Sequence, residues 1–173
     1  MVTIIAYTVI EHTSLFYTLA QIAGVFVGFA ALIAVSALRN ENSGDKEQQA
    51  LTGVVMTGLF AIIGALLPIL LSIYEIPLSR VWVVSAGMML VFDWITIGFQ
   101  YNALKNALKR RNAWDGFFWV LVEGSVQLPL ILILLPVLTA QAFALYATML
   151  IVTIFQAAAL LMFLVLDTKQ NAD

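Results

Sequence analysis

Residues 13–38 read TSLFYTLAQIAGVFVGFAALIAVSAL, a run of 26 residues without a single charged side chain. A helix of about 20 apolar residues is long enough to cross the roughly 30 Å hydrocarbon core of a bilayer. Four more predominantly apolar stretches follow, at residues 51–73, 81–101, 117–137 and 141–166. We therefore predict an all-α, polytopic integral membrane bundle of five transmembrane helices, which forms a single transmembrane domain over residues 1–173.

The composition of the whole chain agrees with this prediction. Of its 173 residues, 62% are hydrophobic and only 10% are charged, whereas about 25% of the residues in an ordinary soluble domain are charged. The stretches are continuously apolar, unlike the alternating strands of about ten residues in a membrane β-barrel. Little chain is left outside them, so no extramembrane domain with its own core is expected. The predicted surrounding is the lipid bilayer, and the net charge of −2 does not indicate a nucleic-acid partner.

Lysine and arginine residues indicate how the helices are oriented. One of the eight, Arg80, falls on the side of the N-terminus and of the loops after the second and fourth stretches, and the other seven fall on the opposite side. Short cytoplasmic loops collect these residues, so we predict an external N-terminus, a cytoplasmic C-terminus and the cytoplasmic (inner) membrane of a prokaryote. Residues 102–115 carry several of the cations and are expected to extend the third helix along the membrane surface.

The ends of the apolar stretches suggest which residues lie at the membrane interface. Residues 2–10 are apolar but too few to cross a bilayer alone, so we expect an interfacial segment rather than an extension of the first helix. Trp82, Trp114 and Trp119 lie near predicted helix ends and are expected to be interfacial anchors. Trp94 lies too deep for that role, and we expect it to be packed against other helices.

Two acidic residues stand inside the apolar stretches. At about 1.5 Å per helical residue, Asp93 lies roughly 12 Å and Glu123 roughly 9 Å from the cytoplasmic boundary, so they are at similar depths. An ionised side chain at the centre of a membrane helix costs about 2.5 to 3.5 kcal/mol, and an acid there needs a partner, a proton or water. In the alternative interpretation, both acids are neutral or hydrogen-bonded to nearby glutamines and only hold helices together.

Polar residues recur at helical spacing around both acids. Steps of three and four residues place five side chains on one face of the third stretch: Ser85, Met89, Asp93, Thr96 and Gln100. Glu123 and Gln127 form an i, i+4 pair on the fourth stretch. A face of the fifth stretch consists of Gln141, Thr148, Val152 and Gln156. We predict that these faces meet at a hydrated, acid-lined cavity in the inner half of the membrane, suited to small cations or protons. The predicted cation pathway consists of Asp93, Glu123, Gln127, Gln156, Thr96 and Gln100.

The first two stretches are rich in small residues. Small side chains allow helix backbones to approach closely in a bilayer, where the hydrophobic effect does not drive helices together. These positions are predicted to serve helix packing, either within the chain or at the interface of a homo-oligomer. They are Gly24, Gly28, Ala31, Gly53 and Gly64.

Several chemical functions lack the residues that they need. The chain has no cysteine and one histidine, so thiolate metal sites and the two imidazole ligands of a membrane haem are excluded. It also lacks nucleotide-binding, zinc-protease and serine-hydrolase motifs. We expect no enzyme, no cofactor and no metal site. The favoured hypothesis is a homo-oligomeric channel or transporter for a small cation. The alternatives are a non-catalytic accessory or scaffold subunit of a membrane complex, which would bind another membrane subunit, and a membrane sensor.

Overall fold

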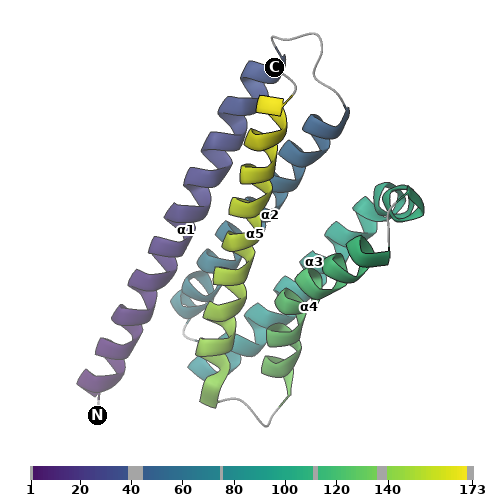
Figure 1. Ribbon diagram of the computed structural model, residues 1–173. Helices are drawn as coiled ribbons and strands as arrows, with labels where there is room; N and C mark the ends of the chain where they lie inside the picture. The colour runs from purple at the N-terminus through teal and green to yellow at the C-terminus, as the bar shows by residue number, and fades with distance from the viewer. Residues whose placement is uncertain (1, 39–44, 75, 111–112, 136–139, 171–173) are drawn as a thin grey trace. The chain divides into compact units, whose positions relative to one another are not determined.

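The computed structural model describes residues 2–38, 45–74, 76–110, 113–135 and 140–170 (Figure 1). These residues form five α-helices and contain no strand, which confirms the predicted all-α class. The helices are α1 (Val2–Leu38), α2 (Asp45–Ile73), α3 (Leu78–Arg110), α4 (Ala113–Leu134) and α5 (Ala142–Gln170).

Four of the helices contain segments that are long and apolar enough to cross a membrane. The segments are Thr13–Ile33 in α1, Leu51–Ile73 in α2, Arg80–Gly98 in α3 and Ala142–Met162 in α5. Among the described residues of α4, the apolar segment Val120–Leu134 is shorter. At about 1.5 Å per residue it extends for roughly 22 Å, less than the hydrocarbon core of a bilayer. The structure thus supports a membrane protein with four long spans, and the fifth crossing stays a prediction.

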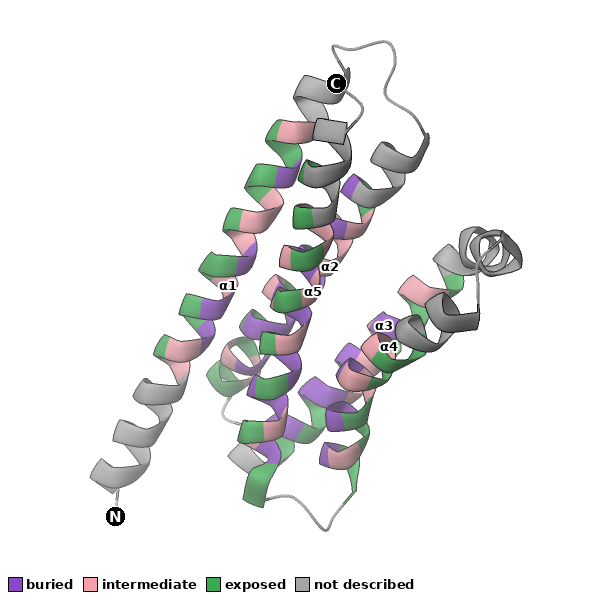
Figure 2. Ribbon diagram, viewed as in Figure 1, coloured by how far each residue is buried: buried purple, intermediate pink, exposed green. Residues whose placement is uncertain are grey.

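Large apolar side chains cover much of the exposed surface. Leu32 of α1, Val91 of α3 and Phe155 of α5 are among the most exposed of them. Figure 2 shows that the described parts of the helices have both buried and exposed sides. Exposed apolar surface on this scale is unfavourable in water but matches contact with lipid chains. The surface therefore agrees with the membrane class that the apolar segments indicate.

The N-terminal residues differ from the expectation of a separate interfacial segment. Val2–Leu38 is one uninterrupted helix, so residues 2–10 extend α1. No glycine or proline occurs between Val2 and Ala23, and the sequence therefore offers no helix-breaking residue there. The third helix is predicted to extend along the membrane surface over residues 102–115. In the structure, α3 continues to Arg110, in agreement with the first part of that prediction. Residues 111 and 112 of that extension lie outside the described residues.

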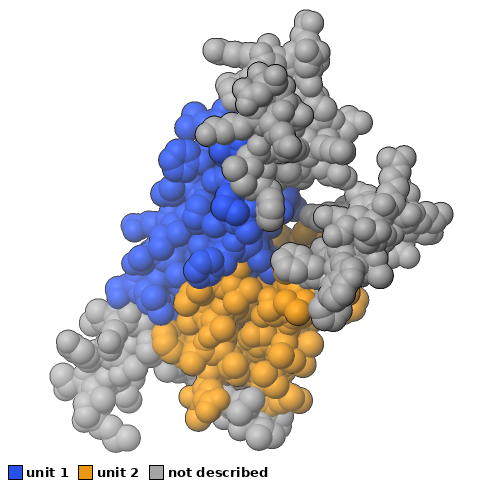
Figure 3. Space-filling view, in the orientation of Figure 1, with its two compact units in different colours: residues 1–69, 153–173 blue, residues 70–152 orange. Residues whose placement is uncertain are grey.

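The chain divides into two compact units, coloured separately in Figure 3. The first unit consists of residues 1–69 and 153–173, and the second consists of residues 70–152. Helices α2 and α5 therefore contribute to both units, α1 belongs to the first, and α3 and α4 belong to the second. The predicted single transmembrane domain stays a prediction.

In the first unit, α1 and α2 pack closely at Gly58. A methyl group added at Gly58 would overlap Cγ2 of Val27 and would lie 3.5 Å from the carbonyl oxygen of Ala23. Nearby, Ala30, Leu51 and Val54 are buried and form a small apolar core. Because Gly58 has no side chain, the backbone of α2 lies directly against the side chain of Val27 in α1.

The predicted small-residue positions fall into two groups. On α2, Gly64 is buried and Gly53 is half-buried, where an added methyl group would meet Cδ1 of Leu160 at an ordinary 3.6 Å. On α1, by contrast, Gly28 and Ala31 are exposed. Nothing among the described residues lies within 4 Å of a methyl group built at Gly24 or Gly28. These α1 positions are not used for close packing within the described chain, and their place in an oligomer interface stays a prediction.

We expect Gly58→Ala to lower the free energy of unfolding by about 1 to 3 kcal/mol, the usual cost of overpacking a filled interior. The added methyl group displaces the branched side chain of Val27, which has little freedom to move. Thermal unfolding of the purified protein in detergent measures the effect. Gly28→Ala is the matched control, because its methyl group enters open space. Equal losses in the two variants would contradict the described contact between α1 and α2.

Candidate functional site

The polar face predicted for α3 is the buried face of that helix. Ser85, Met89 and Asp93 are buried, and Thr96 is half-buried. Their spacing of four, four and three residues aligns them along one side of the helix. The exposed side carries Val91, Trp94 and Ile95. The side chain of Gln100, the last member of the predicted face, lies outside the described residues.

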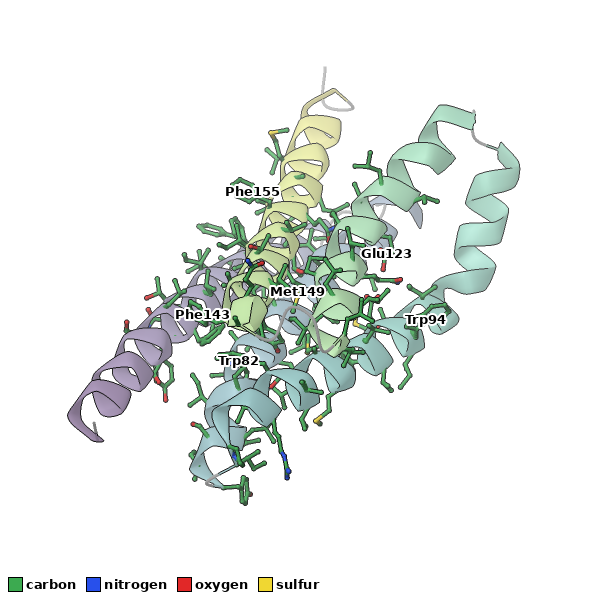
Figure 4. All side chains as sticks on the ribbon, turned by 90° about the horizontal axis from the view of Figure 1, so that it is seen from below. Trp82, Trp94, Glu123, Phe143, Met149 and Phe155 are labelled. Atoms are coloured by element: carbon green, nitrogen blue, oxygen red, sulfur yellow. The ribbon has the colours of Figure 1, made fainter. Side chains whose placement is uncertain are left out.

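Asp93 meets two polar side chains of the neighbouring helix α4. Nε2 of Gln127 donates a hydrogen bond of 2.9 Å to Oδ2 of Asp93. The carboxyl group of Glu123 lies beside the side chains of Asp93 and Gln127, close enough to interact with both. Because Glu123 and Gln127 are four residues apart, they share one side of α4, and this side faces α3 (Figure 4). Three of the six predicted pathway residues therefore lie together.

This cluster consists of two carboxyl groups, which we call the carboxyl pair, and one amide. Asp93 is 8% exposed, and both Glu123 and Gln127 are half-buried. Two ionised carboxylates in contact repel each other strongly, and a proton or a cation between them removes the repulsion. Among the described residues, no group of three or more acidic, histidine or cysteine side chains is placed to hold a metal ion. The arrangement is suited to binding one small positive charge.

The other predicted pathway residues are placed differently. The Thr96 hydroxyl donates a 2.9 Å hydrogen bond to the carbonyl oxygen of Phe92, within its own helix. Gln156 is half-buried and lies in the part of α5 that belongs to the first unit. In the second unit, the predicted polar residues Gln141, directly before α5, and Thr148, within α5, are exposed. The first part of the predicted polar face is therefore exposed, whereas Val152 and Gln156 farther along α5 are half-buried.

The buried side of α5 instead carries Tyr146, Met149 and Leu150. Sequence analysis missed Tyr146, which is fully buried and lies beside α3. The signal was present in the spacing of its buried neighbours, because Ala142, Tyr146 and Met149 follow one another at steps of four and three. This side is apolar like the rest of the helix, so hydropathy alone did not distinguish it.

Two tryptophans of α3 occupy positions opposite to those predicted. Trp82 is only 6% exposed, and its ring centroid lies 5.6 Å from Phe143 and 5.9 Å from Tyr146, so it is a packed residue rather than an exposed anchor (Figure 4). Trp94 is 60% exposed rather than packed. Helical phase explains both outcomes: Trp82 is on the same side of α3 as Asp93, whereas adjacent residues such as Asp93 and Trp94 point about 100° apart. The side chains of Trp114 and Trp119 lie outside the described residues.

Comparison with protein-family models, curated proteins and solved structures finds no match for this chain. The fold and the site therefore define its class by themselves. The described part of the chain forms α-helices, four of them able to cross a membrane, and its second unit contains a carboxyl pair between two helices.

Proposed function

We propose that this protein is a channel or transporter for a small cation, such as a proton, and that the carboxyl pair lies in the cation's path. The observation that carries the proposal is the contact of Asp93 with both Glu123 and Gln127. Ionisable side chains within membrane segments are costly, and they commonly mark the paths of ions and protons. In this role the carboxyl pair binds the cation, and the amide of Gln127 orients the carboxyl group of Asp93.

The proposal includes five membrane crossings, with an external N-terminus and a cytoplasmic C-terminus in a prokaryotic inner membrane. Helix α4 has 22 residues and is about 33 Å long, which matches the thickness of the hydrocarbon core. The sequence that precedes Val120 is also apolar, since Phe117, Phe118 and Trp119 come directly before it. The one-to-seven distribution of lysine and arginine supports the orientation.

A homo-oligomer is part of the same proposal. Five helices rarely enclose a wide pore by themselves, and symmetric assembly is the usual way in which small subunits form one. Gly28 and Ala31 leave a shallow, exposed strip on α1 that is suited to close contact with a second copy. The same strip also supports the second candidate function, an accessory or scaffold subunit that binds another membrane protein.

Flux measurements on the purified protein in lipid vesicles test the proposal. A potassium gradient with valinomycin supplies the voltage while a pH-sensitive dye measures proton flux. Potassium flux is measured separately, with a potassium electrode and vesicles that contain no valinomycin. We expect cation flux above that of protein-free vesicles, with anions excluded. Absence of flux at several voltages and pH values would contradict the proposal and favour the accessory subunit.

Glu123→Gln is expected to reduce this flux by about tenfold, the factor that corresponds to losing one hydrogen bond to a charged group. The variant keeps the shape of the side chain and removes its charge. Ser125→Ala is the matched control on α4, because the Ser125 hydroxyl donates its 2.6 Å hydrogen bond to the carbonyl oxygen of Val122 within the helix. Unchanged flux in Glu123→Gln would remove Glu123 from the path.

A further inference from the structure

Two buried hydroxyl groups lie near the Arg80 end of α3. One belongs to the side of α3 that carries Asp93, and the other belongs to α5. Ser85 of α3 and Tyr146 of α5 both have 0% exposure, and we call them the hydroxyl pair. Ser85 is eight residues from Asp93, which corresponds to about 12 Å along the helix axis. The two hydroxyl groups are close to each other. Nevertheless, Oγ of Ser85 has no partner at hydrogen-bonding geometry among the described residues.

A buried hydroxyl group without a partner points to a missing ligand. Leaving such a group unsatisfied is unfavourable, and it is more so in an apolar medium than in water. Buried water commonly satisfies polar groups of this kind by bridging them. The aromatic ring of Trp82 lies 5.9 Å from that of Tyr146, so an aromatic side chain packs beside the hydroxyl pair. A water molecule is the ligand that fits two hydroxyl groups in this setting.

Met89 separates the hydroxyl pair from the carboxyl pair. It is four residues from Ser85 and four from Asp93, so it lies between them on the same side of α3, and it is only 1% exposed. Its side chain is apolar and flexible, with three rotatable bonds. Met89 therefore places an apolar side chain between the polar side chains of Ser85 and Asp93, about one helical turn from each.

We propose that Ser85 and Tyr146 bind a water molecule that continues the path from the carboxyl pair, that Met89 is the barrier between them, and that the transported cation is a proton. This inference rests on the proposed function and narrows it. Ser85, Met89 and Tyr146 are at most 1% exposed, and stripping water from a metal ion to pass such a buried segment is costly, whereas a proton can pass along hydrogen bonds. Because about 12 Å of helix separates the two pairs, the proton crosses only when Met89 moves aside and further water molecules fill the gap. Each of these water molecules accepts a proton from the side of the carboxyl pair and releases another toward the Arg80 end, so it is regenerated. The carboxyl group that gave up the proton takes a new one from the opposite side.

Proton and potassium flux in the vesicle assay test this inference with substitutions that remove single oxygen atoms. We expect Ser85→Ala and Tyr146→Phe each to lower proton flux by about fivefold, the factor that corresponds to losing one hydrogen bond. Wild-type protein is expected to carry protons and not potassium. Both substitutions keep the packing volume nearly unchanged, and thermal unfolding verifies that the variants are folded.

Met89→Ala tests the barrier separately, because it opens the segment between the two pairs. We expect it to raise proton flux, whereas Met88→Ala, at the adjacent exposed position, leaves flux unchanged. Proton flux that is lost in Asp93→Asn but retained in the Ser85, Tyr146 and Met89 variants would overturn this inference and leave the proposed function standing. Potassium flux equal to proton flux, with potassium measured in vesicles without valinomycin, would also overturn it. Absence of any flux in the wild-type protein would overturn the proposed function itself.

Discussion

Replacing Asp93 by asparagine is expected to reduce cation flux by roughly 10- to 150-fold. Hydrogen bonds to a charged group contribute about 1.5 to 3 kcal/mol, and each 1.36 kcal/mol in a barrier changes the rate tenfold. Asp93 is the more buried member of the carboxyl pair, and it is held by Gln127 at 2.9 Å. Asparagine has nearly the same shape but can neither carry the charge nor release a proton. Vesicles with equal amounts of wild-type and variant protein provide the comparison.

Thr18→Val is a suitable control for this experiment. Thr18 is a polar residue of the Thr13–Ile33 segment, and its hydroxyl donates a 2.9 Å hydrogen bond to the carbonyl oxygen of Ser14. Removing it changes an intramembrane polar group without affecting the carboxyl pair, so flux should stay at the wild-type level. If flux survives in both Asp93→Asn and Glu123→Gln, the carboxyl pair does not lie in the path.

Trp82→Ala is expected to lower the free energy of unfolding by about 3 to 5 kcal/mol, the typical effect of truncating a buried large aromatic residue. The ring of Trp82 is almost fully buried and connects α3 to α5 through Phe143 and Tyr146. Its removal leaves a cavity where two helices now meet. Chemical unfolding in mixed micelles, followed by the loss of helical signal, measures the change.

Trp94→Ala provides the comparison within the same helix. Trp94 is 60% exposed, and substitutions at exposed positions usually change stability by no more than about 0.5 kcal/mol. We therefore expect the two tryptophan variants to differ by several kcal/mol. Similar losses in both would show that the described rotation of α3 is wrong.

The helices could be predicted from the sequence because the length of an apolar run by itself indicates a membrane helix. Long apolar runs such as residues 51–73 leave few alternatives to a membrane helix. The meeting of Asp93 with Glu123 and Gln127 was also predictable, because polar groups inside a membrane need partners and these residues lie at similar depths. A long apolar run exposed to water and an unpaired acid inside a membrane are both unfavourable in free energy, so the sequence leaves few other arrangements.

The rotation of each helix was harder to predict, since lipid and protein interior are both apolar. Hydropathy then carries little information about which side of a helix is buried. On α3, Ser85 and Asp93 indicated the buried side correctly, but the depth of Trp94 was mistaken for burial. On α2, the close approach to α1 occurs at Gly58, whereas the pattern had pointed to Gly53 and Gly64. Only the structure shows which glycine faces Val27.

The hydrogen bond between Gln127 and Asp93 also bears on how the chain enters the membrane during synthesis. Helix α3 precedes α4, so Asp93 reaches the bilayer before the side chain that pairs with it. Until α4 follows, α3 carries an intramembrane acid at a cost of about 2.5 to 3.5 kcal/mol. We therefore expect α3 and α4 to enter the bilayer together, as a helical hairpin.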